Sequence, residues 1–180
     1  GDHVIGLPGL LFRFNLIGRD APLHIYGFRN LFYYLFFHHK ILGLKVNYPF
    51  HVWEIDNQNK KLIHFEGIES IEPKEILKIE SNTILENERF SIKYATVNHS
   101  VETFGYSFIE KPRYGKFNPE RAKKLGIPEG KIYGELQKGK PVLFKGKKID
   151  PIKEKIVGPK RTGRKFTYSG DTAFSESLVE

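Results

Sequence analysis

The stretch GDHVIGLPGLL, residues 1–11, opens the chain and decides how the rest of it is interpreted. It places a carboxylate and an imidazole side by side, in Asp2 and His3, directly before a mostly apolar segment. Adjacent Asp and His side chains on a strand-to-helix loop can bind one divalent cation together. Pro8 fits a first helical turn, so a buried helix is predicted from Leu7 to Ile17. Capping of that helix by Asp2 is the alternative, so the pair by itself leaves metal binding open.

Two later positions offer metal ligands of the same kind. His99 follows a strand that the alternation of side chains predicts from Phe90 to Val97, and it is either a ligand or an ordinary surface histidine. Asp171 follows a predicted strand from Lys165 to Tyr168, at the strand end where sites gather in α/β sheets. The alternative for Asp171, or for Thr172, is to cap a helix predicted from Ala173 to Glu180.

The composition limits the classes of protein and of site. Hydrophobic residues make up 39% and charged residues 28% of the chain, as in globular proteins. Cysteine is absent, which excludes disulfides and thiolate metal sites and makes a reducing, cytoplasmic compartment the default. Any metal must then be held by His and carboxylates. The remaining histidines show no ligand spacing and are interpreted as structural: His24, His38, His39, His51 and His64.

The ends of the chain and its apolar runs add two expectations. Position 1 is not Met, so Gly1 is expected to be a processed end or the start of a fragment. The longest apolar run, Leu31 to Phe37, is far too short to span a bilayer, and no membrane association is expected.

The remaining pattern predicts an α/β (α+β) protein. Strands are predicted at Leu23–Tyr26, Val46–Ile55 and Thr103–Ile109, and Pro49 favours an edge position for the second of these. A helix rich in aromatic residues is predicted from Phe28 to Leu42. Its aromatic side chains are interpreted as core or dimer packing.

Positive charge is concentrated in one segment of the chain. The net charge is +8, but Lys111–Lys165 holds 18 Lys/Arg against 5 Asp/Glu, and the remainder has a balance of −5. Such a segment indicates a polyanion site, with a solvated lysine-rich loop as the alternative. Two short helices are predicted in it, from Asn118 to Leu125 and from Ile132 to Lys138. Residues 111–164 are interpreted as a protruding arm that adds few apolar residues to any core, between a core part at 1–110 and a return to the core at 165–180.

Taken in order, these motifs resemble those of the RNase Z family, tRNA 3′-processing endonucleases of the metallo-β-lactamase superfamily. Residues 1–11 resemble the end of the HxHxDH motif and its GLPGLL continuation. Asn98-His99-Ser100, followed by Phe104-Gly105-Tyr106, resembles the third histidine motif. Ser169-Gly170-Asp171-Thr172 resembles the bridging aspartate motif, and Leu125–Pro128 with Gly134–Gly139 resembles the flexible arm, or exosite. The resemblance covers essentially the whole chain.

The resemblance implies a metallo-β-lactamase αβ/βα sandwich, here incomplete, with a two-zinc site. Asp2 and His3 would bind one Zn²⁺, His99 would bind the other, and Asp171 would bridge both. Asp2 would also orient or deprotonate the attacking water. The arm would hold the precursor tRNA through phosphate contacts. The residues expected to make these contacts are Lys116, Arg121, Lys123, Lys124, Lys131, Lys138 and Lys140.

The function implied by the resemblance is removal of the 3′ trailer from precursor tRNA by a zinc-dependent, homodimeric, cytoplasmic endoribonuclease. The chain lacks the family's earlier and later histidine ligands, so it is expected to be a truncated portion that binds zinc weakly and cleaves little. Two alternatives remain open. One is a metallo-β-lactamase-fold phosphodiesterase with another substrate, and the other is a non-catalytic RNA-binding fragment.

Overall fold

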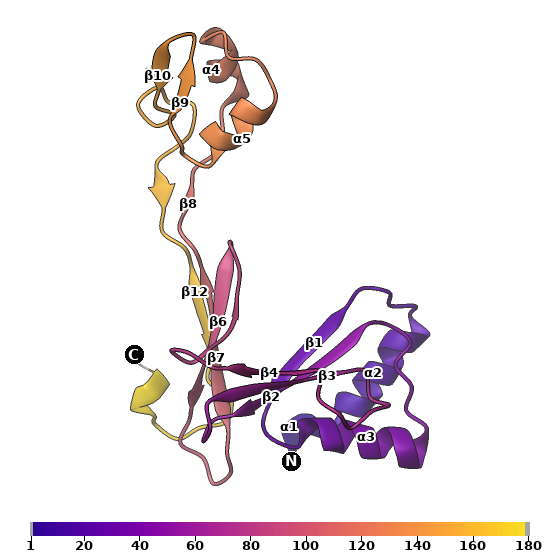
Figure 1. The fold of residues 1–180 in the computed structure, drawn as a ribbon. Coiled ribbons are helices and arrows are strands. Elements are labelled where there is room, and N and C mark those ends of the chain that lie inside the picture. Colours follow the sequence, from indigo (N-terminus) through magenta and orange to yellow (C-terminus); the bar gives the residue numbers. More distant parts are fainter. Residues whose placement is uncertain (1, 179–180) are drawn as a thin grey trace. The chain divides into compact units, whose positions relative to one another are not determined.

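The computed structural model describes residues 2–178, and the side chains of residues 3–177. The chain forms two compact units. The first comprises Gly1–Leu85, Ile92–Ser107 and Thr167–Glu180, and the second comprises Glu86–Ser91 and Phe108–Phe166. Helices and strands are mixed in both (Figure 1), so the protein is of the α+β class that the sequence predicts. Among the described residues, no helix has the length and apolar character needed to cross a membrane.

A four-stranded sheet of order β1-β2-β3-β4 organises the first unit. Its strands are β1 (Leu23–Gly27), β2 (Phe50–Asp56), β3 (Lys61–Glu66) and β4 (Glu75–Lys78). The β1 and β2 strands are parallel, and the other neighbours are antiparallel. The helices α2 (Leu7–Leu16) and α3 (Leu31–Leu42) lie beside this sheet (Figure 1) and bury side chains with it in one cluster. That cluster includes Leu11, Phe32, Leu35, Val52 and Phe65.

Two details of this layer differ from the sequence prediction. The predicted edge position of the Val46–Ile55 strand is wrong, because β2 begins at Phe50 and is paired on both sides. Pro49 precedes the paired residues, so its missing N–H removes no bond from the ladder, and its carbonyl accepts the Leu23 N–H at 2.9 Å. Helix α3 begins at Leu31 rather than Phe28, because Asn30 is left-handed, at φ 71°.

A buried carboxylate from β2 caps helix α3. Asn30 makes no side-chain cap, and Oε1 of Glu54 instead accepts the Phe32 N–H at 2.8 Å. Burial raises the pKa of the Glu54 carboxyl. Arg29 holds this carboxylate and its neighbour together, with Nε 3.8 Å from Glu54 Oε2 and Nη1 2.5 Å from Asp56 Oδ2. Hydrogen bonding from the Asn59 side chain, with Arg29 adding to it, lowers the pKa of Asp56.

Replacement of Arg29 by Ala is expected to destabilise the protein by about 2 kcal/mol, because it leaves two nearly buried carboxylates without their cation. This loss of stability is smaller than that for a fully buried ion pair because the Arg29 side chain is 48% exposed. Urea unfolding measures the change, and Arg13→Ala is the matched control, since Arg13 is exposed on α2. Equal free energies of unfolding for the two variants would contradict this account of the α3 cap.

A second sheet has the order β12-β7-β6-β5. It contains β5 (Thr83–Glu86), β6 (Phe90–Thr96), β7 (Phe104–Glu110) and β12 (Lys165–Tyr168). The last three confirm strands that the sequence predicts. Within the first unit, Ile55 from the first sheet shares a buried cluster with Ile84, Tyr94 and Phe104 from the second. The first sheet and the part of the second sheet that belongs to the first unit therefore share an apolar layer.

Both ends of the first unit depart from the predicted local structure. Asp2 and His3 lie in a short helix, α1 (Asp2–Ile5), and not in a loop. Residues 171–175 are irregular, and a 3-10 turn, η1 (Glu176–Leu178), replaces the part of the predicted Ala173–Glu180 helix that the structure describes. Neither Asp171 nor Thr172 therefore caps an α-helix.

The second unit has an apolar core of its own. It contains a ribbon of β8 (Arg113–Tyr114) and β11 (Lys160–Arg161), the helices α4 (Pro119–Lys124) and α5 (Lys131–Gln137), and a hairpin of β9 (Val142–Phe144) and β10 (Lys147–Ile149). The Asn118 side chain caps α4, accepting the Arg121 N–H at 3.0 Å. The expectation that this segment adds few apolar residues to any core is wrong, because Ala122, Ile127, Leu136 and Ile156 form a buried cluster.

Candidate metal centre

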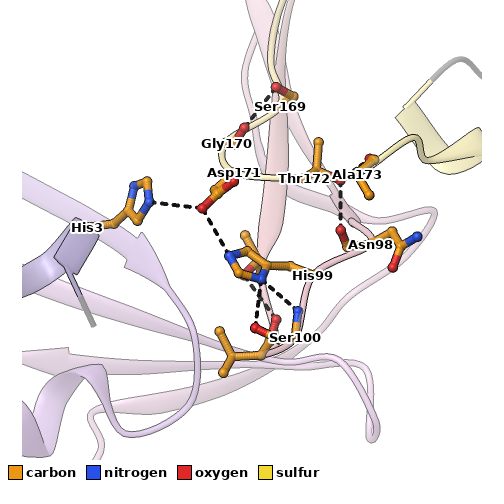
Figure 2. A network of polar contacts seen from close by, with 11 residues as sticks. His3, Asn98, His99, Ser100, Ser169, Gly170, Asp171, Thr172 and Ala173 are labelled. Carbon is orange, nitrogen blue, oxygen red and sulfur yellow. Dashed lines mark hydrogen bonds and ion pairs between the residues drawn. The ribbon is translucent and has the colours of Figure 1, made fainter.

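Backbone and side-chain bonds fix the loop that carries Asp171. Gly170 lies between β12 and Asp171 with φ +69°, a left-handed conformation that favours glycine. After Asp171, the Thr172 hydroxyl and the Ala173 N–H both donate to the Asn98 carbonyl, at 3.2 and 2.9 Å (Figure 2). Because Asn98 directly precedes His99, these bonds hold Asp171 beside that imidazole.

His99 follows β6 and faces the Asp171 carboxylate. Its Nε2 is 3.1 Å from Asp171 Oδ2. On the other side of the ring, the Ser100 backbone N–H donates to Nδ1 at 2.6 Å, and the Ser100 hydroxyl is 3.0 Å from the same atom. Since Nδ1 accepts this bond, the neutral ring carries its proton on Nε2 and donates it to Asp171. Binding of a cation at Nε2 would replace that proton.

His3 completes the group from the N-terminal side. Its Nε2 is 3.7 Å from Asp171 Oδ2, so two imidazoles approach the same carboxylate oxygen (Figure 2). The side chains of His3, His99 and Asp171 are 57%, 28% and 59% exposed, so water and a small ligand can reach them. The side chain of Asp2, the remaining sequence-predicted ligand, lies outside the described residues.

The donor set and its spacing fit a borderline cation such as zinc. Two atoms bound at about 2.0–2.2 Å to a tetrahedral zinc lie roughly 3.3–3.6 Å apart, and the two Nε2–Oδ2 distances of 3.1 and 3.7 Å bracket that separation. Among the described residues, no three His, Asp or Glu side chains are grouped so as to hold a single metal ion. The arrangement is instead a carboxylate shared between two histidines, which suits one cation on each side of Asp171.

Three histidines that the sequence analysis treats as structural come together elsewhere in the first unit. Nδ1 of His51 is 3.0 Å from Nε2 of His64, and Nδ1 of His64 is 3.0 Å from Oε1 of Glu75. The His24 ring stacks on His51 at 4.3 Å. Burial is the main cause that lowers the pKa of His24 and of His51. The spacing of these histidines in the sequence does not indicate the group. It forms because the register of β1 and β2 pairs His24 with His51.

The sequence-predicted RNA-binding residues fall into two kinds in the second unit. Arg121, Lys123, Lys138 and Lys140 form ion pairs with glutamates of the same unit. Lys116, Lys124 and Lys131 have no ion-pair partner among the residues that the structure describes.

Comparison with known proteins identifies relatives along the whole chain. No protein-family model matches it. Ribonuclease Z from Methanosarcina acetivorans is 33% identical over 99% of this chain and 50% of its own length. Ribonuclease Z from Nitrosopumilus maritimus is 34% identical over all of this chain and 52% of its own length. Ribonuclease Z from Prochlorococcus marinus is 34% identical over 99% of this chain and 51% of its own length.

The chain thus spans about half the length of the curated relatives it matches. Among solved structures, the short form of human tRNase Z aligns with 62% of this chain and with 40% of its own chain, at 20% sequence identity. The TM-score of 0.40 is too low to support a fold assignment. The sequence matches decide the question of family. With about a third of its residues identical to these relatives from end to end, the chain belongs to the ribonuclease Z family.

Proposed function

We propose that the protein is a zinc-dependent endoribonuclease that removes the 3′ trailer from precursor tRNA. The observation that carries the proposal is the convergence of His3 and His99 on one oxygen of Asp171. These residues come from three distant parts of the chain, and the resemblance of their motifs to those of the family implies that they are metal ligands. The ribonuclease Z relatives supply the substrate class.

In this proposal Asp2 and His3 would hold one Zn²⁺, His99 would hold the other, and Asp171 would be a ligand of both. Bound zinc lowers the pKa of a water molecule and stabilises negative charge on the phosphodiester. The carboxylate of Asp2 would orient the attacking water or accept a proton from it. The Asn98 carbonyl, through its bonds to Thr172 and Ala173, keeps Asp171 in place for its two cations.

The two apposed sheets of the first unit, with α2 and α3 beside one of them, support a metallo-β-lactamase sandwich as the complete fold. The second unit would serve as the exosite that binds the tRNA away from the cleaved bond. Its excess of Lys and Arg supports this role, because neutralising phosphates supplies affinity without sequence specificity.

We further propose a cytoplasmic homodimer formed through α2 and α3. The outer faces of these helices expose large apolar side chains, including Leu16 (72%), Phe37 (55%) and Ile41 (76%). Exposed apolar side chains in such number are typical of a protein–protein contact. Light scattering should give twice the monomer mass for the chain and the monomer mass for Ile41→Glu, and a monomeric wild-type chain would contradict the dimer.

The cleavage assay tests the proposed function. The 180-residue polypeptide is incubated with zinc and a precursor tRNA that carries a 3′ trailer. It is expected to cleave this tRNA on the order of 100-fold more slowly than ribonuclease Z from Nitrosopumilus maritimus does. The reason is that metal ligands implied by the family are not among its residues. Any residual cleavage should occur at the trailer junction and stop when zinc is chelated. Cleavage at the relative's rate would contradict the expected weakness, and zinc-independent cleavage would contradict the proposed chemistry.

A further inference from the structure

Negative charge in the second unit is concentrated next to its helices. Glu129 lies 3.0 Å from Lys123, and Glu154 lies 3.2 Å from Arg121. Glu135 contacts two lysines, Lys138 at 3.8 Å and Lys140 at 3.3 Å. Glu120 lies in the first turn of α4. Four cations on this side are therefore already compensated by carboxylates of the same unit.

The β9–β10 hairpin presents cations without such partners. Lys145, Lys147 and Lys148 are all exposed, and none forms an ion pair with any residue that the structure describes. The nearest acidic residue in the sequence, Asp150, uses Oδ1 to accept the N–H groups of Ile152 and Lys153, at 2.9 and 3.2 Å. The Asp150 carboxylate also interacts electrostatically with Lys148, so the positive charge of the three lysines is compensated only in part.

The hairpin is also a defined support for these lysines. Lys145 and Gly146 form its turn, with φ of 49° and 76°. Positive φ at both central residues is typical of the type I′ turn of two-residue hairpins. Val142 and Phe144 pack against the apolar cluster of the unit, which anchors the strand. On the opposite side, Leu143 is 76% exposed, directly across from Lys148 in the register. The tip therefore combines lysines on an anchored hairpin with an exposed aliphatic side chain.

We propose that the tip of the β9–β10 hairpin, with Lys145, Lys147 and Lys148, is the surface of the second unit that binds the phosphate backbone of RNA. This assignment rests on the proposed function and names residues outside the sequence-predicted set. An unpaired lysine binds phosphate without giving up a carboxylate, so it contributes the full release of condensed counterions. A lysine paired with Glu135 or Glu129 must break that ion pair, and the freed carboxylate then repels the phosphate. Leu143 would pack against a ribose.

The test compares two triple variants of the 180-residue chain that lose the same charge. K145A/K147A/K148A removes the three unpaired lysines of the hairpin and keeps the unpaired Lys116, Lys124 and Lys131. K123A/K138A/K140A removes three lysines that are paired with glutamates. Binding of a tRNA transcript with a 3′ extension is measured between 50 and 200 mM salt. The slope of log K against log salt is expected to become about 2–3 units less steep in the hairpin variant. Each lost phosphate contact reduces the magnitude of that slope by about 0.7–0.9. In K123A/K138A/K140A the same slope is expected to become less steep by under about 1 unit.

Each outcome separates the hairpin assignment from the proposed function. A normal slope in the hairpin variant, or equal losses in both variants, would overturn the assignment while leaving RNA binding by the second unit intact. A flat salt response of the wild-type chain would contradict the proposed function itself. Thermal unfolding of both variants checks that they fold, which is expected because the replaced lysines lie outside the apolar cluster.

Discussion

Replacement of Asp171 by Asn is expected to weaken zinc binding by the chain on the order of 100-fold. Loss of groups that only orient a ligand typically costs 10–100-fold, and a shared ligand should cost at least as much. Asp171 is the residue that both histidines face, so its carboxylate is expected to contribute to both cations. Asparagine keeps the shape of the side chain but carries no charge. Competition with a chromophoric chelator at fixed pH measures the affinity.

The matched control is Asp150→Asn, which also neutralises one Asp but in the second unit, where the half-buried carboxylate caps a turn. It should leave zinc affinity as in the wild type. Because His ligands must be deprotonated to bind a metal, the affinity of the wild-type chain should also fall as the solution becomes acidic. Equal zinc affinities for Asp171→Asn and the wild type would remove Asp171 from the site.

Removal of residues 116–157 is expected to lower tRNA affinity on the order of 1000-fold at low salt. The excised segment contains 12 Lys/Arg and 5 Asp/Glu, and proteins that make 6–10 phosphate contacts show effects of this size when those contacts are screened. The new junction is short, because Gly115 and Gly158 are in contact and the Gly115 N–H donates to the Gly158 carbonyl at 3.2 Å. Filter binding or fluorescence anisotropy measures the affinity.

The control for this deletion is the zinc affinity of the same variant, which should not change, since His3, His99 and Asp171 all belong to the first unit. The corresponding deletion in a full-length relative separates the two enzymatic alternatives. If the second unit is an exosite, hydrolysis of a small phosphodiester should continue while tRNA cleavage is lost. Retained tRNA affinity after the deletion would place RNA binding in the first unit.

The elements that the sequence predicts are those in which local pattern and tertiary packing agree. The alternating residues from Phe90 onward form β6 as predicted, and Leu7–Leu16 is a mostly apolar segment with a proline in its first turn. In contrast, β4 (Glu75–Lys78) has every residue exposed, so no alternation reveals it. It exists because β3 offers it a partner, which is information that a local pattern does not contain.

The candidate site shows the same division. The motif order indicated His99 and Asp171, yet it predicted a helix after Asp171, where the bonds to the Asn98 carbonyl hold an irregular loop instead. The contact between His51 and His64 depends on the register of two strands and could not be read from spacing. The ion pairs of Glu135 likewise arise from folding of the second unit, so counting lysines could not separate paired from unpaired cations.

X-ray absorption at the zinc edge of the zinc-loaded chain tests most directly the claim that His3, His99 and Asp171 form its metal centre. We predict a shell of nitrogen and oxygen only, at about 2.0–2.2 Å, with the outer-shell scattering of imidazole. That imidazole signal should be reduced in His99→Ala and unchanged in His51→Ala, a histidine of the separate group. A chain that retains no zinc, or an imidazole signal that is lost in His51→Ala and kept in His99→Ala, would contradict the claim.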